Sequence, residues 1–149
     1  MKKTIICGLG VLGMIVVSGS VAMGRTTTAA IGHAEAGSQA NCFNYSYVNG
    51  AVTNICSYAD FIAPLPYDNA GSKNMAFNAK ATAAGAQCRL VATDRMGTTI
   101  SASAMLAIPV TTSYIGQTTG WVSASMDGVL YADCITNNGT SIMGFYYTQ

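Results

Sequence analysis

Apolar and polar residues alternate along most of the chain after residue 40, with a period close to two. Phe43, Tyr45 and Tyr47 occupy alternate positions, and the segments 75–80 and 88–93 show the same spacing. Side chains two residues apart lie on the same face of an extended strand, so this period indicates strands with one buried and one exposed face. We therefore predict half-buried β-strands throughout the C-terminal two thirds of the chain.

Turn-forming residues separate these extended segments. Asn49-Gly50 lies between residues 43–48 and 51–56, and Asn138-Gly139 separates 131–135 from 141–147. Asn-Gly is the characteristic pair of a two-residue hairpin because its residues accept positive φ angles. Further turns are predicted at residues 94–97 and at Asp127-Gly128.

The segment Thr98–Ile108 is ambiguous, because its centre is rich in Ala, Met and Leu and is compatible with a helical turn. We interpret it as a strand, since β-branched residues lead into it and Pro109 ends it. The total is about seven to nine short strands. This pattern predicts an all-β fold, an antiparallel two-sheet β-sandwich that is immunoglobulin-like or jelly-roll-like.

The N-terminus has the three parts of a secretory signal peptide. Lys2 and Lys3 precede an uncharged apolar segment, and small residues follow it. We favour cleavage after Ala22, although Ala30 and Ala36 also end suitable small-residue triplets. An uncleaved membrane anchor is the alternative, because the uncharged segment is long enough to cross a bilayer. Either interpretation places the rest of the chain outside the cytoplasm.

The domain organisation follows from this leader. Residues 1–22 are the predicted signal peptide, 23–40 a flexible lead-in rich in small residues, and 41–149 a single β-sandwich domain. After cleavage we expect no stable membrane span. The predicted location is therefore secreted or at the cell surface.

Charge is scarce: 9% of the residues are charged, the hydrophobic fraction is 50%, and the formal net charge is +1. Such a chain lacks the basic surface that neutralises phosphates, so we expect no nucleic-acid partner. From Gly37 onward there is neither His nor Glu. Imidazole-dependent nucleophiles and the usual zinc sites both require residues that this region lacks. We accordingly expect no catalytic residue, no metal site and no cofactor.

Four cysteines remain after export: Cys42, Cys56, Cys88 and Cys134. No two of them have the C-x-x-C spacing of metal or redox sites. An even number of cysteines in an exported chain indicates disulfides. Three connectivities are possible, and we favour Cys42–Cys56 with Cys88–Cys134 because each pair joins segments predicted as strands.

The order of these features resembles a loose group of small exported proteins with two disulfides, found in environmental bacteria and without assigned activity. The resemblance covers the chain from Cys42 to the C-terminus. It rests on the bridged N-terminal hairpin and on three short motifs, which are Pro64-Leu65-Pro66-Tyr67-Asp68, Cys88-Arg89-Leu90 followed by Asp94-Arg95-Met96-Gly97, and Leu130-Tyr131-Ala132-Asp133-Cys134-Ile135. It implies no substrate, cofactor or catalytic residue.

The strongest candidate for a binding surface is aromatic. The chain has eight Tyr and one Trp, and we select Tyr45, Tyr47 and Trp121 as possible ligand-facing residues. Their amphipathic rings suit a glycan or an extracellular protein partner. The sequence thus predicts an exported, non-catalytic binding or coat module.

Two alternatives remain open. The aromatic C-terminal segment Phe145–Gln149 is similar in texture to the strands of fimbrial subunits that assemble by strand addition. A pair of Asp residues would also suit a secreted hydrolase. We expect this hydrolase least, because most of the Asp residues lie in predicted turns, where they bond the backbone.

Overall fold

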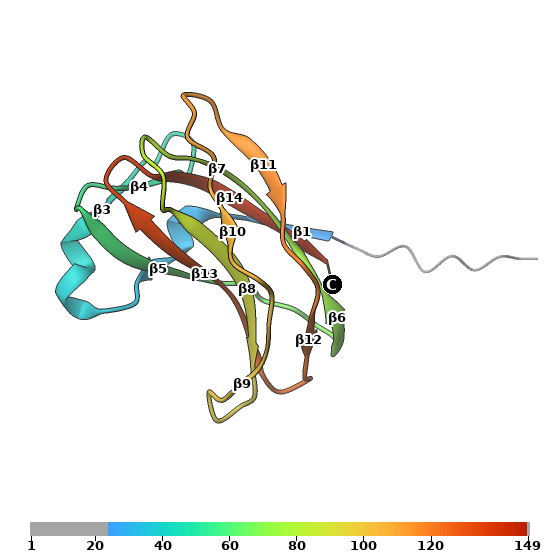
Figure 1. Cartoon of the computed structure of the whole chain (residues 1–149). Helices are drawn as coiled ribbons and strands as arrows, with labels where there is room; N and C mark the ends of the chain where they lie inside the picture. The colour runs from blue at the N-terminus through green and yellow to red at the C-terminus, as the bar shows by residue number, and fades with distance from the viewer. Residues whose placement is uncertain (1–23, 149) are drawn as a thin grey trace, which may run out of the picture.

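The alternation of apolar and polar residues becomes two antiparallel sheets packed face to face in the computed structural model (Figure 1). The structure describes residues 24–148. The predicted signal peptide, residues 1–22, lies outside the described residues and remains a prediction. No helix among residues 24–148 has the length and apolar character that a bilayer crossing requires.

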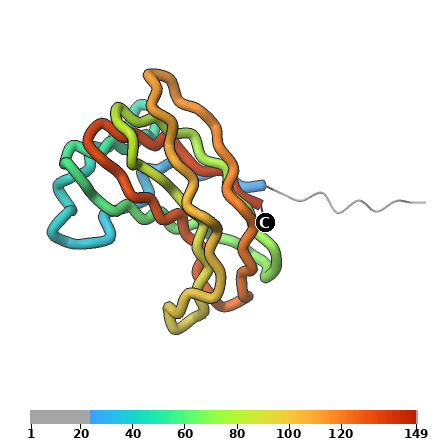
Figure 2. The backbone as a smooth tube through the Cα atoms, viewed as in Figure 1, coloured from blue at the N-terminus to red at the C-terminus, as the bar shows by residue number. Residues whose placement is uncertain are grey.

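Sheet A has six strands in the order β11-β7-β14-β4-β3, and β1 also pairs with β14. Its strands are β1 (Gly24–Thr28), β3 (Phe43–Tyr45), β4 (Val52–Asn54), β7 (Met75–Lys80), β11 (Ile115–Thr118) and β14 (Ser141–Thr148). In Figure 2 the start of β1, in blue, and the end of β14, in red, run side by side. The first described strand is therefore beside the last.

Sheet B also has six strands, in the order β10-β8-β13-β5-β2, with β9 paired to β8. Its strands are β2 (His33–Ala34), β5 (Tyr58–Pro64), β8 (Gln87–Thr93), β9 (Thr99–Ala102), β10 (Leu106–Ala107) and β13 (Val129–Asn137). A separate two-stranded sheet pairs β6 (Gly71–Lys73) with β12 (Val122–Ala124). Two 3-10 helices, η1 (Ala29–Ile31) and η2 (Gly37–Cys42), complete the described elements.

The core lies between the two sheets and is built from the inward side of each alternating strand. Buried and partly exposed residues alternate along β13 and along β7. Phe61 of β5 and Phe77 of β7 are almost fully buried, and the Phe43 and Phe61 ring centroids are 5.2 Å apart. The predicted all-β two-sheet sandwich is confirmed.

Both predicted disulfides are present. Cys42–Cys56 ties the end of η2 to the segment between β4 and β5. Cys88 and Cys134 lie directly opposite each other on neighbouring strands β8 and β13, and both are fully buried. This second bridge therefore fastens two strands of one sheet on the core side.

The two Asn-Gly turns differ from the predicted hairpins. β3 and β4 do pair, but Tyr45 faces Val52, so the loop spans residues 46–51. A backbone hydrogen bond of 2.8 Å from the Ser46 N–H to the Ala51 carbonyl closes this loop, so four residues, 47–50, lie between the bonded residues in place of the predicted two. Asn138-Gly139 connects β13 of sheet B to β14 of sheet A. The local turn is tight as predicted, but it carries the chain across the sandwich instead of forming a hairpin.

The ambiguous segment Thr98–Ile108 is extended, as predicted, but it is interrupted. It contains β9 and β10, with residues 103–105 between them in neither strand. The interruption has a physical cause: the Ser103 hydroxyl accepts the Leu90 backbone N–H at 3.0 Å, which replaces a regular ladder bond. Such breaks divide the sheets into more strands than the predicted seven to nine.

Segment 23–40 differs from the predicted flexible lead-in. Its described residues contain β1, η1, β2 and most of η2. The residues of β1 pair with β14 at five positions, and Ala29 is fully buried. Threonine favours strands, and β14 provides an edge to which this segment adds. Pairing with a distant strand is not visible in the local sequence pattern.

Candidate functional site

The three aromatic residues selected from the sequence occupy different environments. Tyr45 is half-buried against the core, and its phenol donates to the Gly32 carbonyl at 3.3 Å. Burial raises the pKa of Tyr45 above its ordinary value. Tyr47, in the β3–β4 loop, is 96% exposed, and Trp121, between β11 and β12, is 61% exposed. Tyr47 and Trp121 are therefore accessible, whereas Tyr45 is mainly structural.

These residues do not form one platform. Figure 1 shows β3 and β12 at opposite ends of the sandwich. Tyr47 belongs to the β3 end and Trp121 to the β12 end. A single ligand site can therefore include at most one of these two aromatic residues.

A hollow of about 270 Å³ lies on the outer face of sheet A. We call it the sheet A hollow. It is lined by Thr26, Thr27, Thr28, Asn49, Ala76, Phe77, Asn78, Met143, Gly144, Phe145 and Tyr146. β1, β14 and β7 supply all but one of these residues, and Asn49 comes from the β3–β4 loop. Tyr47 is two residues from Asn49 in that same loop.

Small residues at outward positions create the hollow. One cross-strand row runs from Thr28 through Gly144 and Asn78 to Gly116. Residues directly opposite in antiparallel strands point to the same face of the sheet. The two glycines leave no side chain on either side of Asn78. The surface therefore has a depression at Gly144, between the side chains of Thr28 and Asn78.

The next outward row contains the aromatic group. It runs from Thr26 through Tyr146 and Ala76 to Thr118. Tyr146 is 51% exposed, while its neighbours Phe145 and Tyr147 are buried. The alternation along β14 thus sends two rings into the core and one to the outer face.

Gly24 leaves room for the Tyr146 ring. A Cβ at residue 24 would be 1.9 Å from the Tyr146 hydroxyl oxygen and 2.2 Å from its Cζ. The end of the ring thus occupies the space above Gly24, diagonally across β1 from the Tyr146 backbone. The Tyr146 side chain lies over β1 and forms one wall of the hollow.

The polar groups of the hollow are amides and hydroxyls. Asn78 and Asn49 each offer two N–H donors and one carbonyl acceptor, and threonine hydroxyls donate and accept. Asn49 Oδ1 accepts the Ala51 backbone N–H at 3.1 Å, which orients its side chain. None of the described residues that line the hollow is charged.

Further along the same face, Tyr114 covers the neighbouring row. Its hydroxyl is 2.8 Å from Ser141 Oγ, and Lys80 Nζ is 4.9 Å from the centroid of its ring. Lys80 Nζ also donates to the Thr112 carbonyl at 3.2 Å. Lys80 follows Ala76 by four residues on β7, about 13 Å at the usual rise per residue. A second ring therefore borders this face beyond the hollow.

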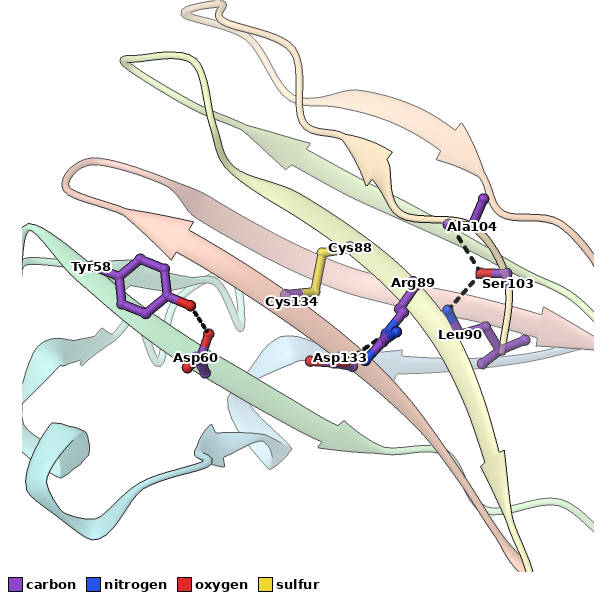
Figure 3. Close-up of polar contacts among 9 residues, drawn as sticks. All are labelled: Tyr58, Asp60, Cys88, Arg89, Leu90, Ser103, Ala104, Asp133 and Cys134. Carbon is purple, nitrogen blue, oxygen red and sulfur yellow. Dashed lines mark hydrogen bonds and ion pairs between the residues drawn. A yellow bond between two sulfur atoms is a disulfide. The ribbon is translucent and has the colours of Figure 1, made fainter. Parts of the chain in front are cut away.

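The outer face of sheet B carries charged residues that are paired with one another (Figure 3). Arg89 Nε contacts Asp133 Oδ2 at 2.7 Å, and the Tyr58 hydroxyl donates to Asp60 Oδ1 at 2.7 Å. This hydrogen bond is the main cause that raises the pKa of Tyr58. The face therefore carries two separate polar pairs, and each of these side chains has a partner on the same sheet.

The carboxylates considered for hydrolysis have local partners. Asp68 pairs with Arg25, and Asp133 pairs with Arg89. Asp94 Oδ1 accepts the backbone N–H of Met96 and Thr98, as expected for an Asp in a turn. Within residues 24–148, no three His, Cys, Asp or Glu side chains gather closely enough to hold a metal ion.

Sequence reasoning missed Tyr146, Asn78 and the threonines of β1. The sequence did contain a signal for Tyr146. In a strand the side chain of Tyr146 must point to the opposite face from those of Phe145 and Tyr147. The sequence does not state which of the two faces is buried. The β1 threonines carried no signal, because they lie in a segment without apolar periodicity.

No protein-family model matches the sequence, and no curated protein matches it. Solved carbohydrate-binding modules share the fold. The C-terminal CBM6 of LamC, a marine laminarinase from Zobellia galactanivorans, has a TM-score of 0.56 and 14% sequence identity, covering 85% of this chain and 100% of that one. The CBM6cm-2 module of Cellvibrio mixtus lichenase 5A, in complex with cellotriose, has a TM-score of 0.54 and 14% identity, covering 84% and 96%.

A third example is the CBM36-1 domain of a multidomain xylanase from the hindgut metagenome of Trinervitermes trinervoides. Its TM-score is 0.51 at 8% identity, covering 85% of this chain and 97% of that one. At these identities the likeness establishes the fold. Of the two predicted sandwich variants, it favours the jelly-roll form.

Proposed function

We propose that this protein is an exported carbohydrate-binding module that holds a neutral glycan in the sheet A hollow. The observation that carries the proposal is the half-exposed Tyr146 ring beside an uncharged depression lined by amides and hydroxyls. A tyrosine ring offers a flat apolar face on which the C–H face of a sugar ring packs. The surrounding amides and hydroxyls match sugar hydroxyls, which both donate and accept hydrogen bonds.

The comparisons support this ligand class over a protein partner. The three solved structures described above are carbohydrate-binding modules, and one of them is in complex with cellotriose. The two disulfides are consistent with an oxidising compartment outside the cytoplasm, where polysaccharides occur. Tyr47 lies in the loop that supplies Asn49, and Tyr114 lies on the same face beyond the hollow, so the proposed ligand is a short linear oligosaccharide that extends past the hollow.

The proposal is tested by replacing Tyr146 and measuring binding to cellotriose and to soluble β-glucan, xylan and mannan. Isothermal titration calorimetry and affinity electrophoresis give the affinities. We expect Tyr146→Ala to weaken binding about tenfold or more, because a stacking contact contributes about 1.4 kcal/mol or more at such a site. The matched control is Tyr58→Ala, since Tyr58 is also 51% exposed but lies on sheet B.

The outcome that contradicts the proposal is equal binding by both variants, or no binding of the unchanged protein to any of these neutral glycans. Tyr47→Ala and Trp121→Ala extend the test to the exposed rings selected from the sequence. We expect a smaller loss for Tyr47, which shares a loop with Asn49, and none for Trp121, which does not line the hollow.

A further inference from the structure

One wall of the sheet A hollow is the first described strand of the chain. Thr26, Thr27 and Thr28 of β1 all line it. β1 pairs with β14 alone among the described strands, in a register that sets Thr26 opposite Tyr146 and Thr28 opposite Gly144. The threonine side of the hollow therefore depends on a five-residue N-terminal segment.

Two glycines fit β1 to this position. Gly24 leaves room for the Tyr146 hydroxyl, as described above. Gly144 allows the backbones to approach closely, because a Cβ at residue 144 would be 2.8 Å from the Thr27 carbonyl oxygen. Gly24 thus leaves space for the Tyr146 ring over β1, and Gly144 allows the β1 backbone to lie close to β14.

Both ends of β1 are fastened. Arg25 forms an ion pair with Asp68 at the beginning of the strand. After its end, Ala29 is fully buried and the Ala30 N–H donates to the Gly50 carbonyl at 3.1 Å. Gly50 belongs to the loop that supplies Asn49 to the hollow. The hydrogen bond from Ala30 to Gly50 therefore joins the end of β1 to the loop that carries Asn49.

The position of β1 gives the choice of cleavage site a functional consequence. Of the three small-residue triplets in the sequence, the one ending at Ala22 precedes β1, whereas those ending at Ala30 and Ala36 follow it. Cleavage at either later position removes Gly24 and the three threonines. Only a cut upstream of Gly24 leaves the hollow intact.

We propose that β1, at the start of the exported chain, completes the carbohydrate site, and that Gly24 is a positioning residue which sets the Tyr146 ring across the strand. The inference rests on the proposed function, since it assigns β1 a role in the same site. Export must therefore leave β1 on the chain if the threonine side of the hollow is to form.

The positioning role is tested with Gly24→Ala. The added Cβ meets the far end of a flexible side chain, so the ring moves while the fold persists. We expect a loss of the ring-current shift on the residue 24 α-proton by NMR and glycan binding weakened about fivefold, equivalent to about 1 kcal/mol. The matched control is Gly37→Ala, because nothing lies within 4 Å of a Cβ there.

The double variant Thr26→Ala with Thr28→Ala tests the role of β1. These changes remove two hydroxyl groups and leave Gly24 and Tyr146 unchanged. We expect weaker binding of cellotriose and the polysaccharide panel, about fivefold for two lost hydrogen bonds. The mass of the protein recovered after export gives its first residue. A first residue beyond Thr28 overturns the inference.

The two proposals fail differently. If the unchanged protein binds no glycan of the panel, the proposed function is wrong. If Tyr146→Ala abolishes binding while Gly24→Ala and the double threonine variant bind like the unchanged protein, the proposed function stands and the inference about β1 is wrong.

Discussion

Lys73 is an unusual residue for this core because it is charged and only 2% exposed. It lies on β6 opposite Val122, and its Nζ is 5.7 Å from the centroid of the Tyr67 ring. Burial lowers its pKa from the ordinary value of 10.5, and the nearby Asp68 carboxylate opposes this shift. The folded chain therefore releases the Lys73 proton at a lower pH than the unfolded chain.

This difference has a definite sign for stability. Between the folded-state pKa of Lys73 and 10.5, the unfolded chain binds more protons than the folded chain. The free energy of unfolding therefore rises with pH across that window, and this contribution is lost as pH falls through the folded-state pKa. Buried tyrosines act oppositely above 10.0, as with Tyr147, whose pKa is raised by burial.

We predict that Lys73→Met removes the rise in stability with pH. Urea unfolding of the unchanged protein and the variant at matched pH values, from neutral pH to just below 10.0, measures the effect, because both proteins contain the same tyrosines and their titration cancels in the difference. As pH rises, the free energy of unfolding of the unchanged protein should increase relative to that of Lys73→Met. Lys80→Met serves as the control for loss of one positive charge. A difference that stays constant with pH would contradict the prediction.

At the scale of elements, the two disulfides constrain different amounts of chain. Cys42–Cys56 closes a segment with a sequence separation of 14, and Cys88–Cys134 one with a separation of 46. The longer loop loses more conformational freedom in the unfolded chain, so chain entropy assigns about 3 kcal/mol to the first bridge and about 4 kcal/mol to the second. The second bridge is also fully buried between β8 and β13.

We predict that replacing Cys88 and Cys134 together by Ala lowers the free energy of unfolding by about 4 kcal/mol, and replacing Cys42 and Cys56 together by about 3 kcal/mol. For Cys88 and Cys134 the loss should exceed the value from chain entropy alone, because removing two fully buried sulfurs also leaves a cavity. Urea unfolding of the two double variants under one set of conditions measures both. The reverse order of stability would count against this account.

At the scale of the whole molecule, the C-terminal strand is flanked on both sides. β7 pairs with one edge of β14, while β4 and β1 pair with successive parts of the other. A subunit that assembles by strand addition needs an open position in its sheet for a neighbour's strand. β1 fills the corresponding place beside β14 with a strand of the same chain.

We therefore predict that the protein cleaved after Ala22, which starts at Met23, is a monomer. Size-exclusion chromatography with light scattering measures its mass, and non-reducing SDS gels show whether resistant ladders form. A monomer supports the binding module over the fibre subunit. Proline at residue 27 removes a backbone donor from β1, so Thr27→Pro weakens the pairing of this strand. Ladders formed by the unchanged protein but not by Thr27→Pro would favour exchange of β1 between copies.

The features that were predicted correctly from the sequence have local chemical causes. The period of two along 75–80 and 88–93 follows from side-chain direction in a strand, and the turns follow from residues that accept positive φ. The preferred pairing of four cysteines follows from predicted export and from the strands that each pair joins. Each of these properties depends on residues close together in sequence, or on a choice among few options. They were enough to predict the two-sheet sandwich and both disulfides.

Only the tertiary structure decided which faces are outward and which strands are neighbours. Alternation separates Tyr146 from Phe145 and Tyr147, but the core must be assembled before one set becomes the surface. Asn138-Gly139 has the same local preference as Asn49-Gly50, yet its flanking strands enter different sheets. β1 pairs with a strand more than a hundred residues away. Sheet pairing is non-local, so the proposed carbohydrate site exists only after β1 has paired with β14.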